Sequence, residues 1–177
     1  GASMPEQQVR DEVLTFFIAG HETTSLALSW TLYLLANHPG IATAARDEVI
    51  RVTAGRRPSA GDYESLGLLK NIFRESLRLY PPAWTFAREA MEDIVICDYF
   101  FPKGSVLWTV TWLLHHREEY FQDAESFRPD RWNDMSESGK QAYYPFGAGP
   151  RMCIGEGFAW MEGVLVLASI LSPYIIA

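Results

Sequence analysis

One cysteine in a glycine-rich stretch is the strongest candidate for chemistry in this sequence. Cys153 lies in the segment 145–157, PFGAGPRMCIGEG, and an apolar run follows directly. Gly147 and Gly149 allow positive φ angles or a close backbone approach, which residues with a Cβ resist. Free N–H groups and the helix dipole at a helix start favour a thiolate. A thiolate on such a loop can ligate a soft metal centre, and the alternative is a small packing cysteine in a turn.

A second candidate lies upstream, where an acid and two threonines stand inside a helical pattern. Residues 19–24 read AGHETT. Gly20 costs about 1 kcal/mol in a helix relative to alanine, and a threonine hydroxyl can bond back to the carbonyl one turn earlier and bend the helix. The neighbouring acid and alcohol, Glu22 and Thr23, could position water and relay protons. The alternative is a solvated acid beside packing threonines.

A third candidate is the pair formed by Glu75 and Arg78. The two residues are three positions apart, so they project from one face of a helix and can form an ion pair. At a surface such a pair contributes only a few tenths of a kcal/mol. Apolar neighbours such as Ile72 and Leu77 indicate partial burial, and a buried pair needs further partners.

The remaining metal-binding residue types give weak signals. His115 and His116 are adjacent, so on a helix they point about 100° apart and do not easily share an ion. Cys97 and Cys153 are far apart and form no C-x-x-C pair, which argues against structural zinc and a disulfide framework. We expect Cys97 to be an inert packing residue in a strand or turn.

Apolar periodicity predicts the elements that must position these residues. Helices are expected at about 5–37, 39–52, 65–80, 111–121 and 155–171, and β-prone runs at 84–86, 94–96, 99–101 and 105–110. The polar stretch 128–141 is expected to be a loop. The first helix carries apolar residues on several faces, which predicts burial through the middle of the fold. The fold class is therefore mainly α with a small antiparallel β-sheet.

Composition limits the possible functions. The chain has 177 residues, 48% of them hydrophobic, and a net charge of −7. This length and apolar share suit one domain, and the negative charge without a Lys/Arg cluster argues against nucleic acid. We expect residues 1–3 to be a tag remnant and 4–177 a single partial domain. No signal peptide is visible, and Glu162 and Pro173 interrupt the apolar tail, so a buried helix and a cytoplasmic location are expected.

Four motifs, in order, resemble those of the cytochromes P450. The cysteine segment matches the haem-binding pattern F-x-x-G-x-R-x-C-x-G, formed by Phe146, Gly149, Arg151, Cys153 and Gly155. Residues 19–24 resemble the (A/G)-G-x-(D/E)-T-(T/S) pattern of the family's long distal helix, and 75–78 its E-x-x-R motif. Residues 127–132, FRPDRW, resemble F-x-P-x-R-(W/F). The match covers essentially the whole chain and corresponds to the C-terminal portion of the family, truncated at both ends.

The resemblance implies a haem b cofactor held by the Cys153 thiolate. Further residues are implied to surround that cofactor: Arg151 and Arg88 at its propionates, and Phe146, Gly147, Gly155, Ala19 and Gly20 along its faces. Glu22 and Thr23 would be the acid–alcohol pair that delivers protons during dioxygen activation. Glu75, Arg78 and Arg131 would form a structural salt-bridge network. Ala19, Trp84 and Thr85 would line what remains of a substrate pocket.

Two functions stay open at this point. Resemblance to the family implies a haem–thiolate monooxygenase that acts on a small hydrophobic substrate with electrons from a reductase or ferredoxin. In this short chain that chemistry is expected to be weakened or peroxidase-like. The alternative is a non-enzymatic, haem-free oligomeric fragment. A long helix without its usual neighbours should expose apolar patches, which predicts self-association into a homo-oligomer.

Overall fold

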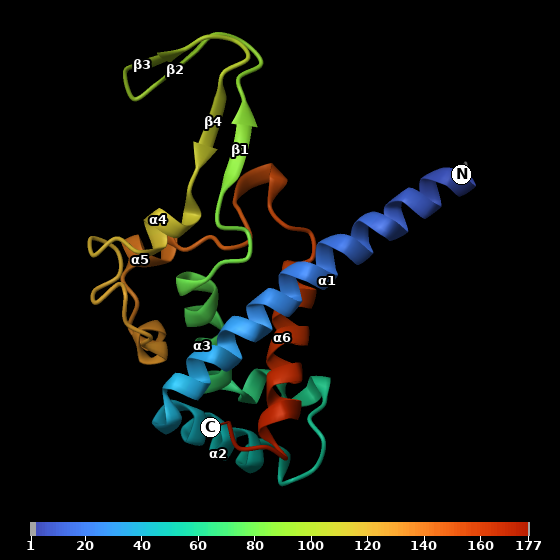
Figure 1. Cartoon of the computed structure of the whole chain (residues 1–177), viewed down its shortest axis with the longest axis vertical. Coiled ribbons are helices and arrows are strands. Elements are labelled where there is room, and N and C mark those ends of the chain that lie inside the picture. Colours follow the sequence, from blue (N-terminus) through green and yellow to red (C-terminus); the bar gives the residue numbers. More distant parts are fainter. Residues whose placement is uncertain (1–2, 177) are drawn as a thin grey trace.

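The computed structural model describes residues 3–176 and is built mainly of α-helices (Figure 1). Within this range the helices are α1 Glu6–Asn37, α2 Pro39–Thr53, α3 Gly67–Leu79, α4 Thr111–His115, α5 Glu137–Ala142 and α6 Glu156–Leu171. Short 3₁₀ turns occupy Ala60–Ser65, Pro129–Asn133 and Gly149–Arg151. The suggested tag remnant includes residues 1 and 2, which lie outside the described residues.

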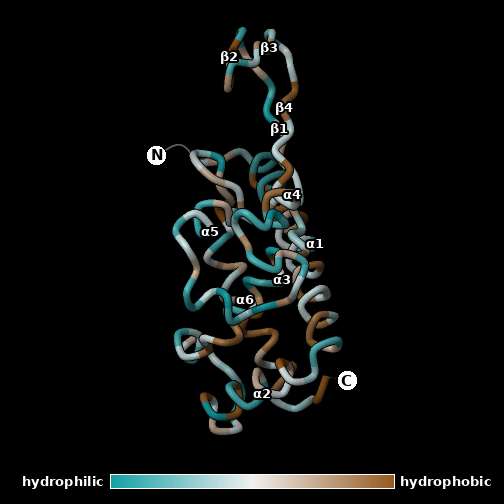
Figure 2. Tube along the Cα trace, turned by 90° about the vertical axis from the view of Figure 1, so that its left-hand side faces the viewer, coloured by the Kyte–Doolittle hydropathy of each residue, from teal (hydrophilic) through white to brown (hydrophobic). Residues whose placement is uncertain are grey.

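The strands form two separate antiparallel pairs. β1 (Phe86–Glu89) pairs with β4 (Val106–Thr109), and β2 (Ile94–Ile96) pairs with β3 (Tyr99–Phe101). The β2–β3 hairpin projects away from the helices in two perpendicular views (Figures 1 and 2). The predicted fold class, mainly α with a small antiparallel strand set, is confirmed. The sequence predicted one small sheet, whereas the strands form two separate sheets. β1 begins at Phe86, the last residue of the predicted strand 84–86.

Three local predictions were wrong. The helix expected at 111–121 ends at His115, because the chain turns after it and brings Phe121 into a small second core. The expected loop 128–141 contains α5, whose start is capped by the Ser136 hydroxyl accepting from the Gly139 N–H at 3.1 Å. Cys97 lies in a turn, as one of the two predicted alternatives had it, because φ values of 48° at Cys97 and 67° at Asp98 form the tight turn between β2 and β3. It is exposed, so the predicted packing role is wrong.

The main core lies where the second half of α1 packs with α2, α3 and α6. Its fully buried side chains include Leu35 of α1, Val49 of α2, Leu69 of α3 and Leu167 of α6. The apolar tail from 158 therefore begins as a packed helix, as the sequence predicted. Within the described residues, no helix combines the length and hydropathy that crossing a membrane requires.

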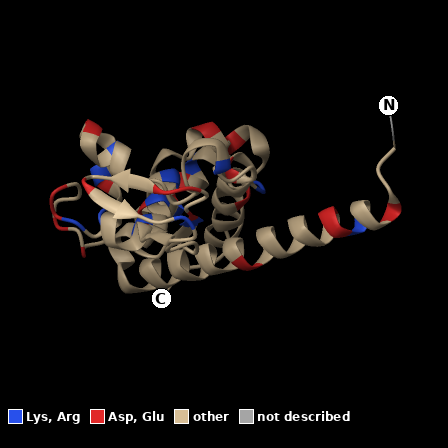
Figure 3. Ribbon diagram, turned by 90° about the horizontal axis from the view of Figure 1, so that it is seen from above, with Lys and Arg blue, Asp and Glu red and all other residues tan. Residues whose placement is uncertain are grey.

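The first half of α1 is uncovered, whereas apolar residues on several of its faces predicted a helix buried through the middle of the fold. Phe16, Phe17 and Ile18 are each at least 60% exposed. Figure 3 shows this half extending beyond the rest of the molecule. The predicted exposure of large apolar surface is confirmed. The residues from 19 to 23, all exposed, lie on this uncovered half.

Replacing Gly163 with alanine should destabilise the fold. A Cβ at this position would lie 2.5 Å from Cζ of Phe73, because α6 and α3 approach closely there. Overpacking of this kind costs about 1–3 kcal/mol. Gly157→Ala, in the same helix with no heavy atom within 4 Å of the added Cβ, is the matched control. Denaturant unfolding should show the loss for Gly163→Ala alone, and equal stabilities would contradict the close packing.

Candidate functional site

The cysteine loop is closed by its own backbone. The carbonyl of Phe146 accepts the N–H of Cys153 at 2.9 Å, and the carbonyl of Gly149 accepts the N–H of Met152 at 3.0 Å. Gly147 has φ of +77° and lies 3.8 Å, measured from an ideal Cβ position, from the ring of Phe86 at the start of β1. A side chain at Gly147 would be strained in this conformation. The loop therefore presents residue 153 in one defined place, beside β1 and ahead of α6.

Cys153 is exposed and lies three positions before the first residue of α6, Glu156. An added Cβ at Gly155 would lie 3.8 Å from the Cys153 Sγ, so the glycine keeps the space next to the sulfur open. Two large apolar side chains near the sulfur in sequence are also uncovered, Ile154 at 88% and Phe158 at 72% exposed. An accessible thiol with uncovered apolar neighbours fits one face of a flat, apolar macrocycle such as haem.

Phe146 anchors the loop from the other side. It packs against the main core, and its ring centroid lies 6.2 Å from that of Trp160 in α6. Trp160 in turn meets Phe73 of α3 edge-on at 5.4 Å. The aromatic contacts connect the loop to α6 and α3, two of the helices that form the core, so the position of Cys153 depends on how these two helices pack.

Arg88 and Arg151 are the two predicted propionate ligands. Arg151 is exposed at the end of a 3₁₀ turn, and Arg88 is exposed on β1, where its Nη1 donates to the carbonyl of Ala87 at 2.8 Å. Within residues 3–176 neither guanidinium forms an ion pair. Both cations are therefore free to bind carboxylates.

The predicted acid and alcohol, Glu22 and Thr23, are neighbours on α1, and in the described part of the chain no hydrogen bond joins their side chains. The Thr23 hydroxyl donates to the carbonyl of Ala19 at 2.7 Å, as the sequence predicted. Glu22 and Thr23 are exposed, and an added Cβ at Gly20 would meet nothing within 4 Å. Among the described residues no hydrogen bond joins 19–23 to the cysteine loop.

Two of the three residues predicted to line the remaining substrate pocket, Trp84 and Thr85, lie directly before β1. Trp84 is 58% exposed, and its carbonyl accepts the N–H of Trp112 at 3.2 Å. The hydroxyl of Thr85 donates to the carbonyl of Thr109 in β4 at 3.1 Å. These bonds hold the entry to β1 beside β4 and α4, while Ala19 lies on the separate, uncovered half of α1.

Glu75 is fully buried and lies at the centre of a hydrogen-bond network. Its carboxylate accepts from Nε and Nη2 of Arg78 at 3.0 and 2.8 Å and from Nε of Arg131 at 2.9 Å. The backbone N–H of Arg128 and the indole N–H of Trp132 complete the set at 3.1 and 2.9 Å. With neither side chain of the Glu75–Arg78 pair exposed, the surface interpretation of the pair is wrong. The buried charge has the additional partners that burial requires.

Arg78 also joins segments that are far apart in the sequence. Its Nη1 donates to the carbonyls of His115 and Ala124, each at 2.7 Å, and its Nη2 donates to that of Ser126 at 3.2 Å. Sequence reasoning singled out Arg131 but missed Trp132, although Trp132 is part of the same FRPDRW segment. It also set His115 aside, because the adjacent His115 and His116 point apart on a helix and do not easily share an ion. The contacts of the buried imidazole were missed, since no local pattern shows them.

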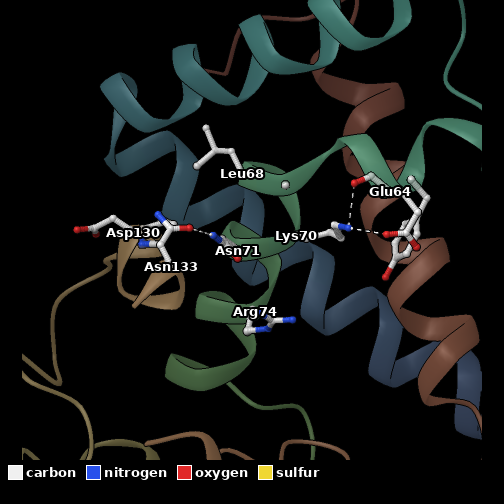
Figure 4. Close-up of a pocket in the computed structure, with 10 residues that line it drawn as sticks. Glu64, Leu68, Lys70, Asn71, Arg74, Asp130 and Asn133 are labelled. Atoms are coloured by element: carbon white, nitrogen blue, oxygen red, sulfur yellow. Dashed lines mark hydrogen bonds and ion pairs between the residues drawn. The ribbon is translucent and has the colours of Figure 1, made fainter. Parts of the chain in front are cut away.

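A polar groove of about 650 Å³ lies on another part of α3 (Figure 4). Lys70 bonds to Glu64 at 3.1 Å, and Asn71 donates to Asn133 at 3.0 Å. The guanidinium of Arg74, which also lines the groove, lies 5.4 and 5.3 Å from the rings of Trp132 and Trp160. No predicted site residue lines this groove. In residues 3–176 no cluster of three or more His, Cys, Asp or Glu side chains could hold a metal ion.

Comparison with known proteins identifies the class. The family described as "Cytochrome P450" matches residues 1–176. The chain therefore belongs to the cytochrome P450 family, whose members carry haem.

Individual relatives come from plants, bacteria and mammals. The chain is 44% identical to a cytokinin hydroxylase of Arabidopsis thaliana, over 95% of its own length and 33% of the relative's. It is 38% identical to cyclooctatin synthase of Streptomyces melanosporofaciens, over 96% and 38%, and 37% identical to cytochrome P450 4V2 of Mus musculus, over 98% and 34%. The chain thus spans about a third of the length of these relatives.

Proposed function

We propose that this chain forms the cysteine side of a haem–thiolate site, with Cys153 as the ligand to iron, in a protein of monooxygenase type. When bound, a haem with a thiolate ligand supplies dioxygen activation for oxygenation of an organic substrate. The observation that carries the proposal is an exposed cysteine on a backbone-closed loop at the start of a helix. Family membership supports haem as the cofactor.

The chain's own residues would hold the cofactor from several sides. Phe146 fixes the loop against the core, while Gly147 and Gly155 keep side chains away from the backbone turn and from the sulfur. Arg151 and Arg88 are exposed and would bind the two propionates, because a guanidinium fork matches a carboxylate. The first turn of α6 follows the cysteine closely, and the N–H of Glu156 donates to the Cys153 carbonyl at 3.5 Å.

Glu22 and Thr23 would move protons at the proposed site. The Thr23 hydrogen is used in its bond to Ala19, so its oxygen keeps lone pairs that accept a proton or a hydrogen bond. Glu22 is exposed and can exchange protons with solvent. Ala19 and Gly20 present little side chain, which would leave room for a small diatomic ligand.

The substrate and the electron donor are proposed by analogy with the family. Names such as cytokinin hydroxylase and cyclooctatin synthase describe those proteins' own reactions. For the whole protein we propose a small hydrophobic substrate and a reductase or ferredoxin as electron donor. In this chain, residues 19–23 are open to water, and a site that does not exclude water favours weak, peroxidase-like chemistry.

An absorption spectrum tests the proposal. The purified chain is mixed with haemin, reduced and exposed to carbon monoxide. A strongly red-shifted Soret band with stoichiometric haem is expected, because the thiolate donates electron density to iron. A band typical of histidine-ligated haem, or no bound haem, would overturn Cys153 as the ligand in this chain and favour the non-enzymatic alternative.

The uncovered half of α1 supports one further property, self-association. Its exposed apolar side chains include Val13, Phe16, Phe17 and Ile18. A contiguous apolar surface of this kind tends to be covered by another protein surface. We expect light scattering to find oligomers at micromolar concentration, and Phe17→Glu to shift them towards monomers. Thr15→Glu, also exposed on this half of α1 but polar to begin with, is the control. A clean monomer for the unchanged chain would contradict the expectation.

A further inference from the structure

His115 is a buried titratable residue that the proposed site does not use. Its side chain is fully buried, at the end of α4. The ring stacks on Tyr143 at 5.3 Å between centroids and meets Phe121 edge-on at 6.1 Å. Burial lowers the pKa of His115 to about 3, with a bond to the carbonyl of Arg78 acting in the opposite direction. The imidazole is therefore neutral near pH 7, with one N–H donor and one bare acceptor nitrogen.

Both ring nitrogens have backbone partners, and these partners determine the tautomer. Nε2 lies 3.2 Å from the backbone nitrogen of Tyr144, which is a donor, so Nε2 must be the bare acceptor. Nδ1 then carries the hydrogen and donates to the carbonyl of Arg78 at 3.2 Å. That carbonyl lies in the last turn of α3, where no intrahelical partner is available.

His115 and Arg78 bind each other in both directions. The Arg78 guanidinium donates to the His115 carbonyl at 2.7 Å, while the His115 imidazole donates to the Arg78 carbonyl. Because Arg78 also holds Glu75, the imidazole is attached directly to the buried network. Movement of this arginine would therefore move the ring.

On its other side the imidazole holds the start of the cysteine loop. Tyr144, which donates to Nε2, uses its own carbonyl to accept the N–H of Gly147 at 3.0 Å. Further along the loop, the Phe146 carbonyl accepts the N–H of Cys153 at 2.9 Å, so this series of backbone bonds leads from Tyr144 to Cys153. Tyr143 adds a parallel link, since its hydroxyl donates to the carbonyl of Arg74 at 3.1 Å.

We propose that His115, as its Nδ1–H tautomer, is a positioning residue that connects the Glu75–Arg78–Arg131 network to the loop bearing Cys153. The imidazole is the side-chain link between Arg78 and the Tyr144 backbone, and it sets where the loop begins. Its effect on ligation rests on the proposed function. The positioning itself concerns only the protein and can be measured without haem.

Three variants separate the two bonds of the imidazole. His115→Asn retains a donor close to the position of Nδ1 and lacks the acceptor for Tyr144. His115→Gln extends an acceptor to the position of Nε2. His115→Phe keeps the ring and lacks both polar contacts. His116→Asn, at the neighbouring histidine, whose Nδ1 bonds only to its own helix at the carbonyl of Trp112, is the matched control.

Hydrogen–deuterium exchange with single-residue resolution is the first readout. In the Asn and Phe variants the amides of Tyr144 and Cys153 should exchange roughly tenfold faster, the effect of losing about one hydrogen bond. In the Gln variant and the His116→Asn control, the amides of Tyr144 and Cys153 should exchange at about the same rate as in the unchanged chain. Unchanged exchange in a folded Phe variant, or the same acceleration in Gln as in Asn, would overturn the proposal.

The second readout is the fraction of carbon monoxide complex with the red-shifted, thiolate-type Soret band. This fraction should fall severalfold in the Asn and Phe variants and recover in Gln. If the unchanged chain shows no thiolate band at all, the proposed function fails, while exchange at Tyr144 and Cys153 still decides the role of His115.

A measurement on the unchanged chain covers the case in which no variant folds. In ¹⁵N-labelled protein, the imidazole nitrogen signals should identify a protonated Nδ1 and a bare Nε2 for His115 at neutral pH. A protonated Nε2 would be incompatible with a bond from the Tyr144 amide, and it would overturn the proposal without any substitution.

Discussion

Replacing Cys153 with alanine should abolish the thiolate-type Soret band of the reduced carbon monoxide complex. The substitution removes the one thiol of the loop that precedes α6. Cys153 is exposed, and its backbone N–H bond to Phe146 does not involve the side chain. The variant should therefore fold normally, with a free energy of unfolding close to that of the unchanged chain.

Cys97→Ala is the matched control for this prediction. Cys97 is also exposed, but it lies at the turn of the β2–β3 hairpin, which projects away from the helices (Figure 1). Its replacement should leave the band unchanged. A band that survives in Cys153→Ala, or that disappears in Cys97→Ala, would show that the ligand was assigned to the wrong residue.

Of all the proposed substitutions, Glu75→Gln should cause the largest loss in the free energy of unfolding. The carboxylate accepts five hydrogen bonds from four residues and neutralises a fully buried guanidinium. The amide has nearly the same shape, but it brings no charge and directs N–H donors at other donors. Removing one partner of a buried ion pair costs about 3–5 kcal/mol, because the remaining charge stays buried and uncompensated.

Chemical denaturation measures this loss, and Glu64→Gln provides the comparison. Glu64 pairs with Lys70 at 3.1 Å, but its side chain is 85% exposed. An exposed pair contributes about 0–1 kcal/mol, so Glu64→Gln should remain close to the unchanged chain. If the two variants lost equal stability, the interpretation of Glu75 as the centre of the buried network would be wrong.

Local sequence patterns were sufficient for much of the fold. Pro39 after Asn37 and His38 predicted where α1 ends, and the apolar stripe in 155–171 predicted α6. The β-prone runs at 94–96 and 99–101 predicted β2 and β3 with their observed bounds. These features depend on backbone propensity and on periodicity, which act over a few residues. Sequence errors arose at 116–121 and 128–141, where tertiary packing and a single Ser136 cap decided the outcome.

For the site, the sequence by itself determined the identity of the chemical groups. The spacing around Cys153, the acid–alcohol pair at Glu22 and Thr23, and the E-x-x-R motif all come from local patterns. The back-bond from Thr23 to Ala19 also follows from a one-turn rule. These patterns were enough to indicate the family.

Only the tertiary structure decided which of these groups are buried together. Glu75 meets Arg131 and Trp132 across more than fifty positions of sequence, and their burial converts a weak surface pair into a network with no exposed charge on Glu75 or Arg78. The same packing places His115 between Arg78 and Tyr144 while the first half of α1 stays uncovered. The physical reason is that burial and hydrogen-bond partnership depend on contacts between distant segments, which no local pattern of residues specifies.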